Sequence, residues 1–124
     1  MTCPFCQIEK KQILLENKNA IAFFDKYPVQ KGHMLIIPKE HVESYFDAND
    51  QQIYDIHELI KLGKQFLERE YSPDGYNIGV NVGSYGGQTI HHLHFHLIPR
   101  YKGDIEDPRG GIRNMIPNLV DYPE

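Results

Sequence analysis

Histidine and cysteine are the residues of this chain best suited to chemistry, and both are clustered. Seven histidines occur among 124 residues, and four of them lie between positions 91 and 96. Alternate side chains of an extended strand point the same way, so His92, His94 and His96 would share one face. The apolar residues between them, Leu93 and Phe95, would face the core. This spacing predicts a strand with a chemically active face and a buried face.

A row of imidazoles at this spacing has three interpretations. The first, a solvated strand face that holds histidines by chance, is disfavoured because random clustering does not give strict alternation. The second is a catalytic zinc on His92, His94 and His96, since neutral imidazoles bind Zn²⁺. The third is catalysis by one nucleophilic imidazole, with the others holding the substrate. An imidazole with a pKa of about 6.5 is largely neutral at pH 7 and can act in this way.

The two cysteines, Cys3 and Cys6, form a C-x₂-C motif near the N-terminus. Nothing in the sequence indicates secretion, so a structural disulfide is not expected. A thioredoxin-like redox pair is also disfavoured, because no predicted strand precedes the motif. A zinc site would need two further ligands, and without a second C-x₂-C these would be imidazoles.

Composition sets the broad class of the protein. A length of 124 residues corresponds to one domain, and 40% hydrophobic with 24% charged residues is typical of a folded globular protein. No apolar run approaches the ~20 residues of a membrane span, and residues 1–10 lack the features of a signal peptide. We therefore expect a cytoplasmic protein without a membrane partner. A net charge of −4 and the absence of basic runs argue against nucleic acid as the ligand.

Hydrophobic periodicity predicts four strands and one helix that position these residues. An amphipathic helix is expected over residues 49–70, capped by Asn49 or Asp50, because apolar residues recur there at helical spacing. The order strand, strand, helix, strand, strand predicts an antiparallel α+β domain. The strands are expected at 20–25, 33–38, 76–82 and 90–100, the first two as a hairpin, with an irregular tail over 101–124. No part in a site is predicted for His33, His57, Gly63 or His91.

The histidine row also resembles the His-φ-His-φ-His-φ-φ signature of the histidine-triad (HIT) family of nucleotide hydrolases and transferases, where φ is an apolar residue. The similarity extends to Asn81, to Gly86-Gly-Gln-Thr89, to Pro99-Arg100 and to the hairpin that ends Ile36-Ile-Pro-Lys-Glu-His41. It covers roughly residues 3–100. The resemblance implies a HIT-like fold: a single HIT domain over residues 1–124, with a motif-bearing core at 1–100 and a tail at 101–124.

The resemblance also implies roles for individual residues. His94 would attack the α-phosphorus of a nucleotide and form a covalent nucleotidyl-histidine, which water then hydrolyses to a nucleoside monophosphate. His96 would donate a hydrogen bond to a phosphate oxygen. The substrate would further contact Asn81, Gln88 and Thr89 at the phosphate, Asp25 at the ribose, and Phe5 and Ile8 at the base. The alternative is that Phe5 and Ile8 are core residues and that Asp25 caps the turn after its strand.

A zinc-bearing branch of the family resembles this chain in its metal ligands. The resemblance implies a structural Zn²⁺ on Cys3, Cys6, His41 and His92, and a homodimer whose sheets join across a two-fold axis. A closed set of two thiolates and two imidazoles leaves no open position for catalysis, so such a zinc would clamp the N-terminal arm to the triad strand.

The substrate class rests on the glycine-rich tail, in which Arg109 or Arg113 would reach a distal phosphate. A similar tail in HIT proteins favours a dinucleoside polyphosphate such as diadenosine tetraphosphate. The alternative substrate is an adenosine 5′-phosphoramidate, and the alternative function is a non-catalytic nucleotide-binding module. A solvated surface loop is the other interpretation of this tail.

Overall fold

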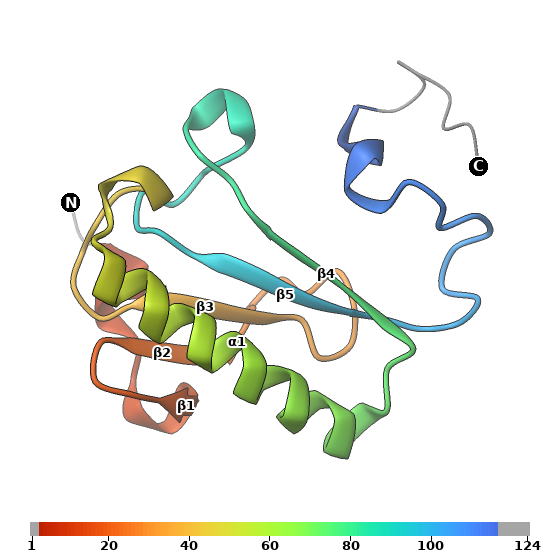
Figure 1. Cartoon of the computed structure of the whole chain (residues 1–124), viewed down its shortest axis with the longest axis horizontal. Coiled ribbons are helices and arrows are strands. Elements are labelled where there is room, and N and C mark those ends of the chain that lie inside the picture. The colour runs from red at the N-terminus through yellow and green to blue at the C-terminus, as the bar shows by residue number, and fades with distance from the viewer. Residues whose placement is uncertain (1–2, 117–124) are drawn as a thin grey trace.

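The computed structural model describes residues 3–116, which form one sheet and one long helix (Figure 1). The five strands lie in the order β1-β2-β3-β5-β4, and every neighbouring pair is antiparallel. The predicted α+β class with one main helix is therefore confirmed. The elements are β1 (Ile13–Glu16), β2 (Ala20–Phe24), β3 (Met34–Pro38), α1 (Asp50–Tyr71), β4 (Gly75–Val80) and β5 (Phe95–Arg100).

Helix α1 starts where its capping residues predict. The Asn49 side chain accepts a hydrogen bond from the backbone N–H of Gln52 at 2.8 Å, and the Gln52 side chain accepts one from the N–H of Asn49 at 2.9 Å. This reciprocal pair satisfies two N–H groups that the first turn leaves free. The helix ends at Tyr71, after which Ser72 adopts a left-handed conformation with φ 51°. Within the described residues 3–116, no helix is long and apolar enough to cross a membrane.

The two faces of the sheet bury different apolar clusters. The face covered by α1 carries Met34 and Ile36 of β3 and Leu97 of β5, all packed against helix residues such as Leu59. Each fully buried side chain of this size stabilises the fold by about 1.5–3 kcal/mol. The opposite face carries a second apolar cluster, formed by Ile21, Phe23, Leu35 and Ile37. The N-terminal residues Phe5 and Ile8 cover part of this cluster.

Strand β1 is the element that the sequence did not predict. It has four residues, and its pairing with β2 is irregular between Ile13 and Leu15. A strand this short, with a shifted register, lacks the regular alternation from which strands are recognised. The sheet therefore has one more strand than the four that periodicity predicts.

The predicted strand over residues 90–100 begins only at Phe95, so the prediction that all three triad histidines lie on one strand face is wrong. Phe95 pairs with Ile36 of β3 and with Val80, the last residue of β4. Beyond this point Pro38 has no N–H to donate to a ladder. His92 and His94 therefore precede the strand, and only His96 belongs to it.

Gly63 of α1 is also not incidental, contrary to the prediction. It is buried, and a Cβ at this position would lie 2.9 Å from the Met34 Sδ and 3.0 Å from the Leu97 Cδ2. Only glycine lets the helix approach the sheet this closely. In the predicted tail, residues 101–116 follow β5 and contain a short 3₁₀ turn at Gly111–Met115, while residues 117–124 lie outside the described part of the chain.

Candidate functional site

The ring of His94 is held in one tautomer by the backbone. Its side chain is 8% exposed, and its Nδ1 lies 2.9 Å from the carbonyl oxygen of His92. A carbonyl only accepts, so Nδ1 must carry the ring proton and donate it. Nε2 of the neutral ring is then left with its lone pair. Phe5 packs edge-on against the imidazole with ring centroids 5.1 Å apart. His94 is thus held in the tautomer that a nucleophilic imidazole acting through Nε2 would need.

His96 is oriented by a chain of hydrogen bonds that starts at a backbone amide. The N–H of Val29 donates to Nδ1 of His33 at 3.1 Å, so the proton of the neutral His33 ring lies on Nε2. That Nε2 lies 2.9 Å from Nδ1 of His96 and donates to it. The proton of His96 must then lie on Nε2. His96 is therefore a hydrogen-bond donor through Nε2.

The charge state of His96 agrees with this arrangement. Burial, together with the neighbouring His94 and His33 imidazoles, lowers the pKa of His96 to about 4, against a smaller opposing effect of Asp25. Burial likewise lowers the pKa of His33. Both rings are therefore neutral at pH 7 and can keep the tautomers that the hydrogen bonds require.

His33 is the site residue that sequence reasoning missed. It is 3% exposed and lies on the same sheet face as His96, because Leu35 of β3 pairs with His96 of β5 and the alternation of β3 carries His33 to that side. The two histidines are 63 residues apart in the chain. In the sequence, His33 alternates with Leu35 and Ile37, which indicates that the three side chains share one strand face. That His33 contacts His96 follows only from the pairing of the two strands.

Asp25 completes a second group beside the triad, but this group does not fit a metal ion. Its Oδ2 lies 3.4 Å from Nε2 of His33, and its Oδ1 accepts from the N–H of Tyr27 at 2.9 Å. The ligand atoms of Asp25, His33 and His96 lie within 4.8 Å of one another. Nε2 of His33 carries a proton, however, because Nδ1 accepts from Val29. A protonated ring nitrogen cannot ligate a metal.

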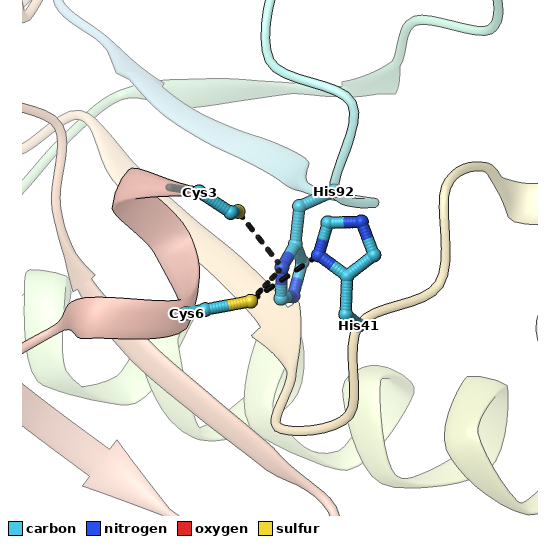
Figure 2. A group of neighbouring side chains, drawn as sticks. All are labelled: Cys3, Cys6, His41 and His92. Carbon is cyan, nitrogen blue, oxygen red and sulfur yellow. Dashed lines mark hydrogen bonds between the residues drawn. The ribbon is translucent and has the colours of Figure 1, made fainter. Parts of the chain in front are cut away.

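A separate cluster gathers the four residues predicted to bind metal (Figure 2). The Sγ of Cys3 lies 3.4 Å from Nδ1 of His92, and the Sγ of Cys6 lies 3.2 Å from Nδ1 of His41. All four candidate ligand atoms lie within 4.8 Å of one another. Within residues 3–116, the triad histidines together form no such group, so the geometry does not support a catalytic zinc shared by His92, His94 and His96.

The tautomer of His92 suits the cluster with the cysteines. Its Nε2 lies 2.9 Å from the carbonyl oxygen of Pro38 and donates to it, so Nδ1 presents its lone pair to the two thiols. Burial is also the main cause that lowers the pKa of His92 and keeps it neutral. Two cysteines and two neutral imidazoles are a donor set that fits tetrahedral Zn²⁺. Because the His92 carbonyl accepts the hydrogen bond from His94, His92 joins the Cys/His cluster to His94.

Gln88, predicted to bind phosphate, is engaged within its own loop. Its Oε1 accepts from the N–H of Gly83 at 3.0 Å, and its Nε2 donates to the carbonyls of Glu43 at 2.7 Å and Ile90 at 3.1 Å. The side chain is 3% exposed. These bonds use both amide hydrogens and hold the loop before the triad. A direct contact of Gln88 with substrate remains a prediction.

The other predicted substrate residues lie in different parts of the fold. Asn81 lines a cavity together with His96. Thr89, next to Gln88 in the chain, is exposed. Ile8 packs on the apolar cluster, and Phe5 lies against Phe23 with ring centroids 5.5 Å apart. In the tail, the exposed guanidinium of Arg109 pairs with the carboxylate of Asp107 at 3.0 Å, and Arg113 lies in the 3₁₀ turn.

Together, a five-stranded antiparallel sheet, a single covering helix and backbone-ordered imidazoles before and on β5 define a histidine-triad protein. A family model described as "HIT domain" matches residues 7–103, and the chain belongs to this family.

Relatives with assigned activities are similar over most of this chain. The adenosine 5′-monophosphoramidase of Schizosaccharomyces pombe is 38% identical, over 81% of this chain and 75% of that protein. The asymmetrical bis(5′-nucleosyl)-tetraphosphatase of the same organism is 32% identical, over 77% of this chain and 53% of that protein. A crystal structure of a hypothetical histidine triad nucleotide-binding protein from Sulfolobus tokodaii matches with a TM-score of 0.76 at 36% identity, covering 85% of this chain and 73% of that one.

Proposed function

We propose that this protein hydrolyses a nucleotide at its α-phosphorus through a covalent nucleotidyl intermediate on His94. The observation that carries the proposal is the 2.9 Å hydrogen bond from Nδ1 of His94 to the backbone carbonyl of His92. This bond leaves the lone pair on Nε2, which is the atom that must attack. Neutral imidazole is a good nucleophile at pH 7, and holding it in one orientation removes part of the entropic cost of the reaction.

The first step is a displacement at phosphorus. Nε2 of His94 forms a bond to the α-phosphorus while the bond from phosphorus to the leaving group breaks, and the leaving group departs with that electron pair. Charge on the phosphoryl oxygens is stabilised by the N–H that His96 carries on Nε2, and by the side chain of Asn81. Removing one preorganised donor of this kind from an active site costs about 2.7–4 kcal/mol of transition-state stabilisation.

The second step regenerates the enzyme. A water oxygen forms a bond to phosphorus as the bond to Nε2 of His94 breaks, and that electron pair returns to the imidazole. The nucleoside monophosphate leaves, and the proton lost by the water passes to solvent. The bond from Nδ1 to the His92 carbonyl persists through both steps and keeps the ring in place.

The leaving group separates two candidate substrates. We propose a dinucleoside polyphosphate such as diadenosine tetraphosphate, which is supported by the similarity to the S. pombe tetraphosphatase and by the acidic and basic glycine-rich tail. An adenosine 5′-phosphoramidate is the second candidate, because the S. pombe phosphoramidase is the more similar of these two relatives.

Trapping the intermediate tests the proposal. The protein is mixed with each substrate, quenched in alkali, and analysed by intact-mass spectrometry with peptide mapping. We expect a nucleotidyl adduct on His94 and release of a nucleoside monophosphate. The His94→Asn variant should form no adduct and lose turnover by more than about 10³-fold, while still binding the nucleotide. Unchanged turnover in His94→Asn would remove this residue from the mechanism.

We further propose that the Cys/His cluster holds a structural Zn²⁺. With four protein ligands the ion would have no open position, so it would fix the N-terminal segment and the segment before β5 and supply no catalytic water. Its ligands would be Cys3, Cys6, His41 and His92, whose ligand atoms lie within 4.8 Å of one another.

The predicted homodimer and cytoplasmic location belong to this proposal as well. Strand β4 is an edge of the sheet, and apolar residues on or just beyond it, Ile78 and Val82, are 45% and 38% exposed. An exposed edge with apolar side chains is suited to pairing with a second copy. Light scattering on the purified protein should give twice the chain mass of 14.4 kDa. A monomer at micromolar concentration would contradict the dimer.

A further inference from the structure

The Cys/His cluster contains two cysteines that can react with each other. Cys6 is exposed and Cys3 is half-buried, and both are free thiols. We propose that this pair is a redox switch, in which oxidation of Cys3 and Cys6 to a disulfide dismantles the cluster and releases His94 from its fixed orientation. The effect on turnover rests on the proposed hydrolysis at His94, whereas the disulfide and the change at the His94 ring do not.

The backbone between the two cysteines has the shape that a disulfide needs. The N–H of Cys6 donates to the carbonyl of Cys3 at 3.1 Å, which closes a tight turn over the two residues between them. Such a turn brings its first and last Cα atoms within about 7 Å of each other, and disulfides join Cα atoms that are ~4.4–6.8 Å apart. The two Sγ atoms lie within 4.8 Å of each other. Rotation of the two side chains can therefore bring the sulfurs together within this turn.

The oxidant is a peroxide, which accepts the two electrons that the cysteines lose. The exposed Cys6 sulfur attacks one peroxide oxygen, so that a sulfenic acid forms and hydroxide leaves. The Cys3 sulfur then attacks the Cys6 sulfur, and the S–S bond forms while the S–O bond breaks with loss of a second hydroxide. Both hydroxides become water with the protons of the thiols, or with protons from solvent where the sulfurs are zinc-bound thiolates. One peroxide and two cysteines thus give one disulfide and two waters.

Oxidation removes the partner of a buried ring nitrogen. Nδ1 of His92 lies 3.4 Å from the Sγ of Cys3 and 3.5 Å from that of Cys6, and Figure 2 shows both thiols directed toward this ring. A thiol can donate a proton to Nδ1 and a thiolate can share a zinc ion with it, but a disulfide can do neither. His92 is fully buried, so water does not replace the lost partner. Since a buried polar group without a partner is costly, we expect the ring or the turn to move.

Two contacts carry this movement to His94. The carbonyl of His92 accepts the hydrogen bond that fixes the His94 ring, 2.9 Å from its Nδ1. Phe5, which lies between the two cysteines in the chain, packs edge-on against the same ring with centroids 5.1 Å apart. A shift of His92 or of the turn therefore loosens the His94 ring. The pair differs from a thioredoxin motif, because its oxidation acts on a neighbouring side chain and not on a substrate disulfide.

The experiment treats the reduced, zinc-loaded protein with hydrogen peroxide. Peptide mapping should find a Cys3–Cys6 disulfide within single chains, and a metallochromic dye should detect the release of about one zinc per chain. The nitrogen NMR signals of the His94 ring should change from one tautomer, protonated on Nδ1, to a mixture of tautomers. Turnover should fall by roughly tenfold or more, and should return to within about twofold of the starting value after dithiothreitol and zinc are added.

Cys6→His is the matched control, because an imidazole can replace the thiolate as a zinc ligand but cannot form a disulfide. After peroxide treatment this variant should keep its zinc, its His94 ring signals and, within about twofold, its own untreated turnover. Equal losses in Cys6→His and in the wild type would overturn the switch. If Cys6→His does not fold or binds no zinc, the recovery of the wild type decides, because dithiothreitol reduces a disulfide whereas methionine sulfoxide needs its own reductases.

The proposal is also overturned if peroxide gives no Cys3–Cys6 disulfide, if the disulfide links two chains, or if it forms while the His94 ring signals stay unchanged. If the wild-type protein contains no zinc, the mapping and the ring signals decide the question on the metal-free protein. If the wild type hydrolyses no nucleotide, the proposed function fails, but the disulfide and the ring signals still test the switch. The two failures are therefore distinguishable.

Discussion

His92 and His96 lie two residues on either side of His94 and yet belong to different machinery. His92 is fully buried, its Nε2 donates to the Pro38 carbonyl, and its Nδ1 faces two thiols. His96 is partly exposed, its Nδ1 accepts a hydrogen bond from Nε2 of His33, and it lines the cavity. We therefore propose that one end of the triad serves the structure and the other end serves the substrate.

The difference shows that the partners of a histidine, and not its spacing, decide its task. The chain leaves the sheet between the two residues, because β3 and β4 offer no further pairing before Phe95. His92 therefore moves toward the N-terminal segment, while His96 stays on the sheet face beside His33. The backbone carbonyl of His92 then links both ends through His94.

The largest expected effect is the loss of stability when a ligand is removed from the Cys/His cluster. We expect the wild-type protein to carry one zinc per chain and Cys3→Ser to carry almost none, with a loss of more than about 3 kcal/mol in the free energy of unfolding. Elemental analysis and urea unfolding measure the two quantities. The exposed His57→Asn variant is the control for general effects of substitution. If the wild-type protein contains no zinc and is as stable as Cys3→Ser, the cluster does not need an ion.

Substituting His96 and His92 separately sharpens the comparison. His96→Asn should keep its zinc and its fold but lose about 10²–10³-fold in kcat/KM, because the transition state loses a preorganised donor. His92→Asn should instead lose zinc and stability first, with activity falling as the protein unfolds. Steady-state kinetics and zinc content are measured on the same samples. Zinc loss in His96→Asn would contradict the division of the triad.

The sequence predicts which residues could do chemistry, but it does not predict their contacts across the sheet. Residue type and spacing were enough to single out the triad and the Cys3/Cys6 pair, because those signals are local in the chain. The break before Phe95 depends on where two distant strands end, and the role of His33 depends on a partner 63 residues away. Gly63 matters only because of its distance to Met34 across the core. Such features appear only when the sheet is assembled.

A smaller effect is expected for His33, which acts on the substrate only through His96. Removing it in His33→Ala should lower kcat about tenfold with little change in KM, since His96 loses the donor that fixes its tautomer. His33→Gln should recover part of the loss, because its amide can accept from Val29 and donate to His96. A merely structural role would predict equal losses for both variants, scaling with their stability. Kinetics and thermal unfolding of the pair decide between the two.

The smallest effect should be the pH dependence of stability that His96 adds. Its pKa of about 4 in the folded protein lies below the ordinary value of 6.5, so between these pH values the unfolded chain binds a proton that the folded chain does not. The stabilising contribution is complete above pH 6.5 and is lost as the pH falls toward 4. The free energy of unfolding should therefore drop less between pH 7 and pH 5 in His96→Asn than in the wild type, whereas His57→Asn should follow the wild type. Urea unfolding at both pH values measures this difference, and identical slopes for wild type and His96→Asn would mean that solvent reaches the ring as freely in the folded protein as in the unfolded chain.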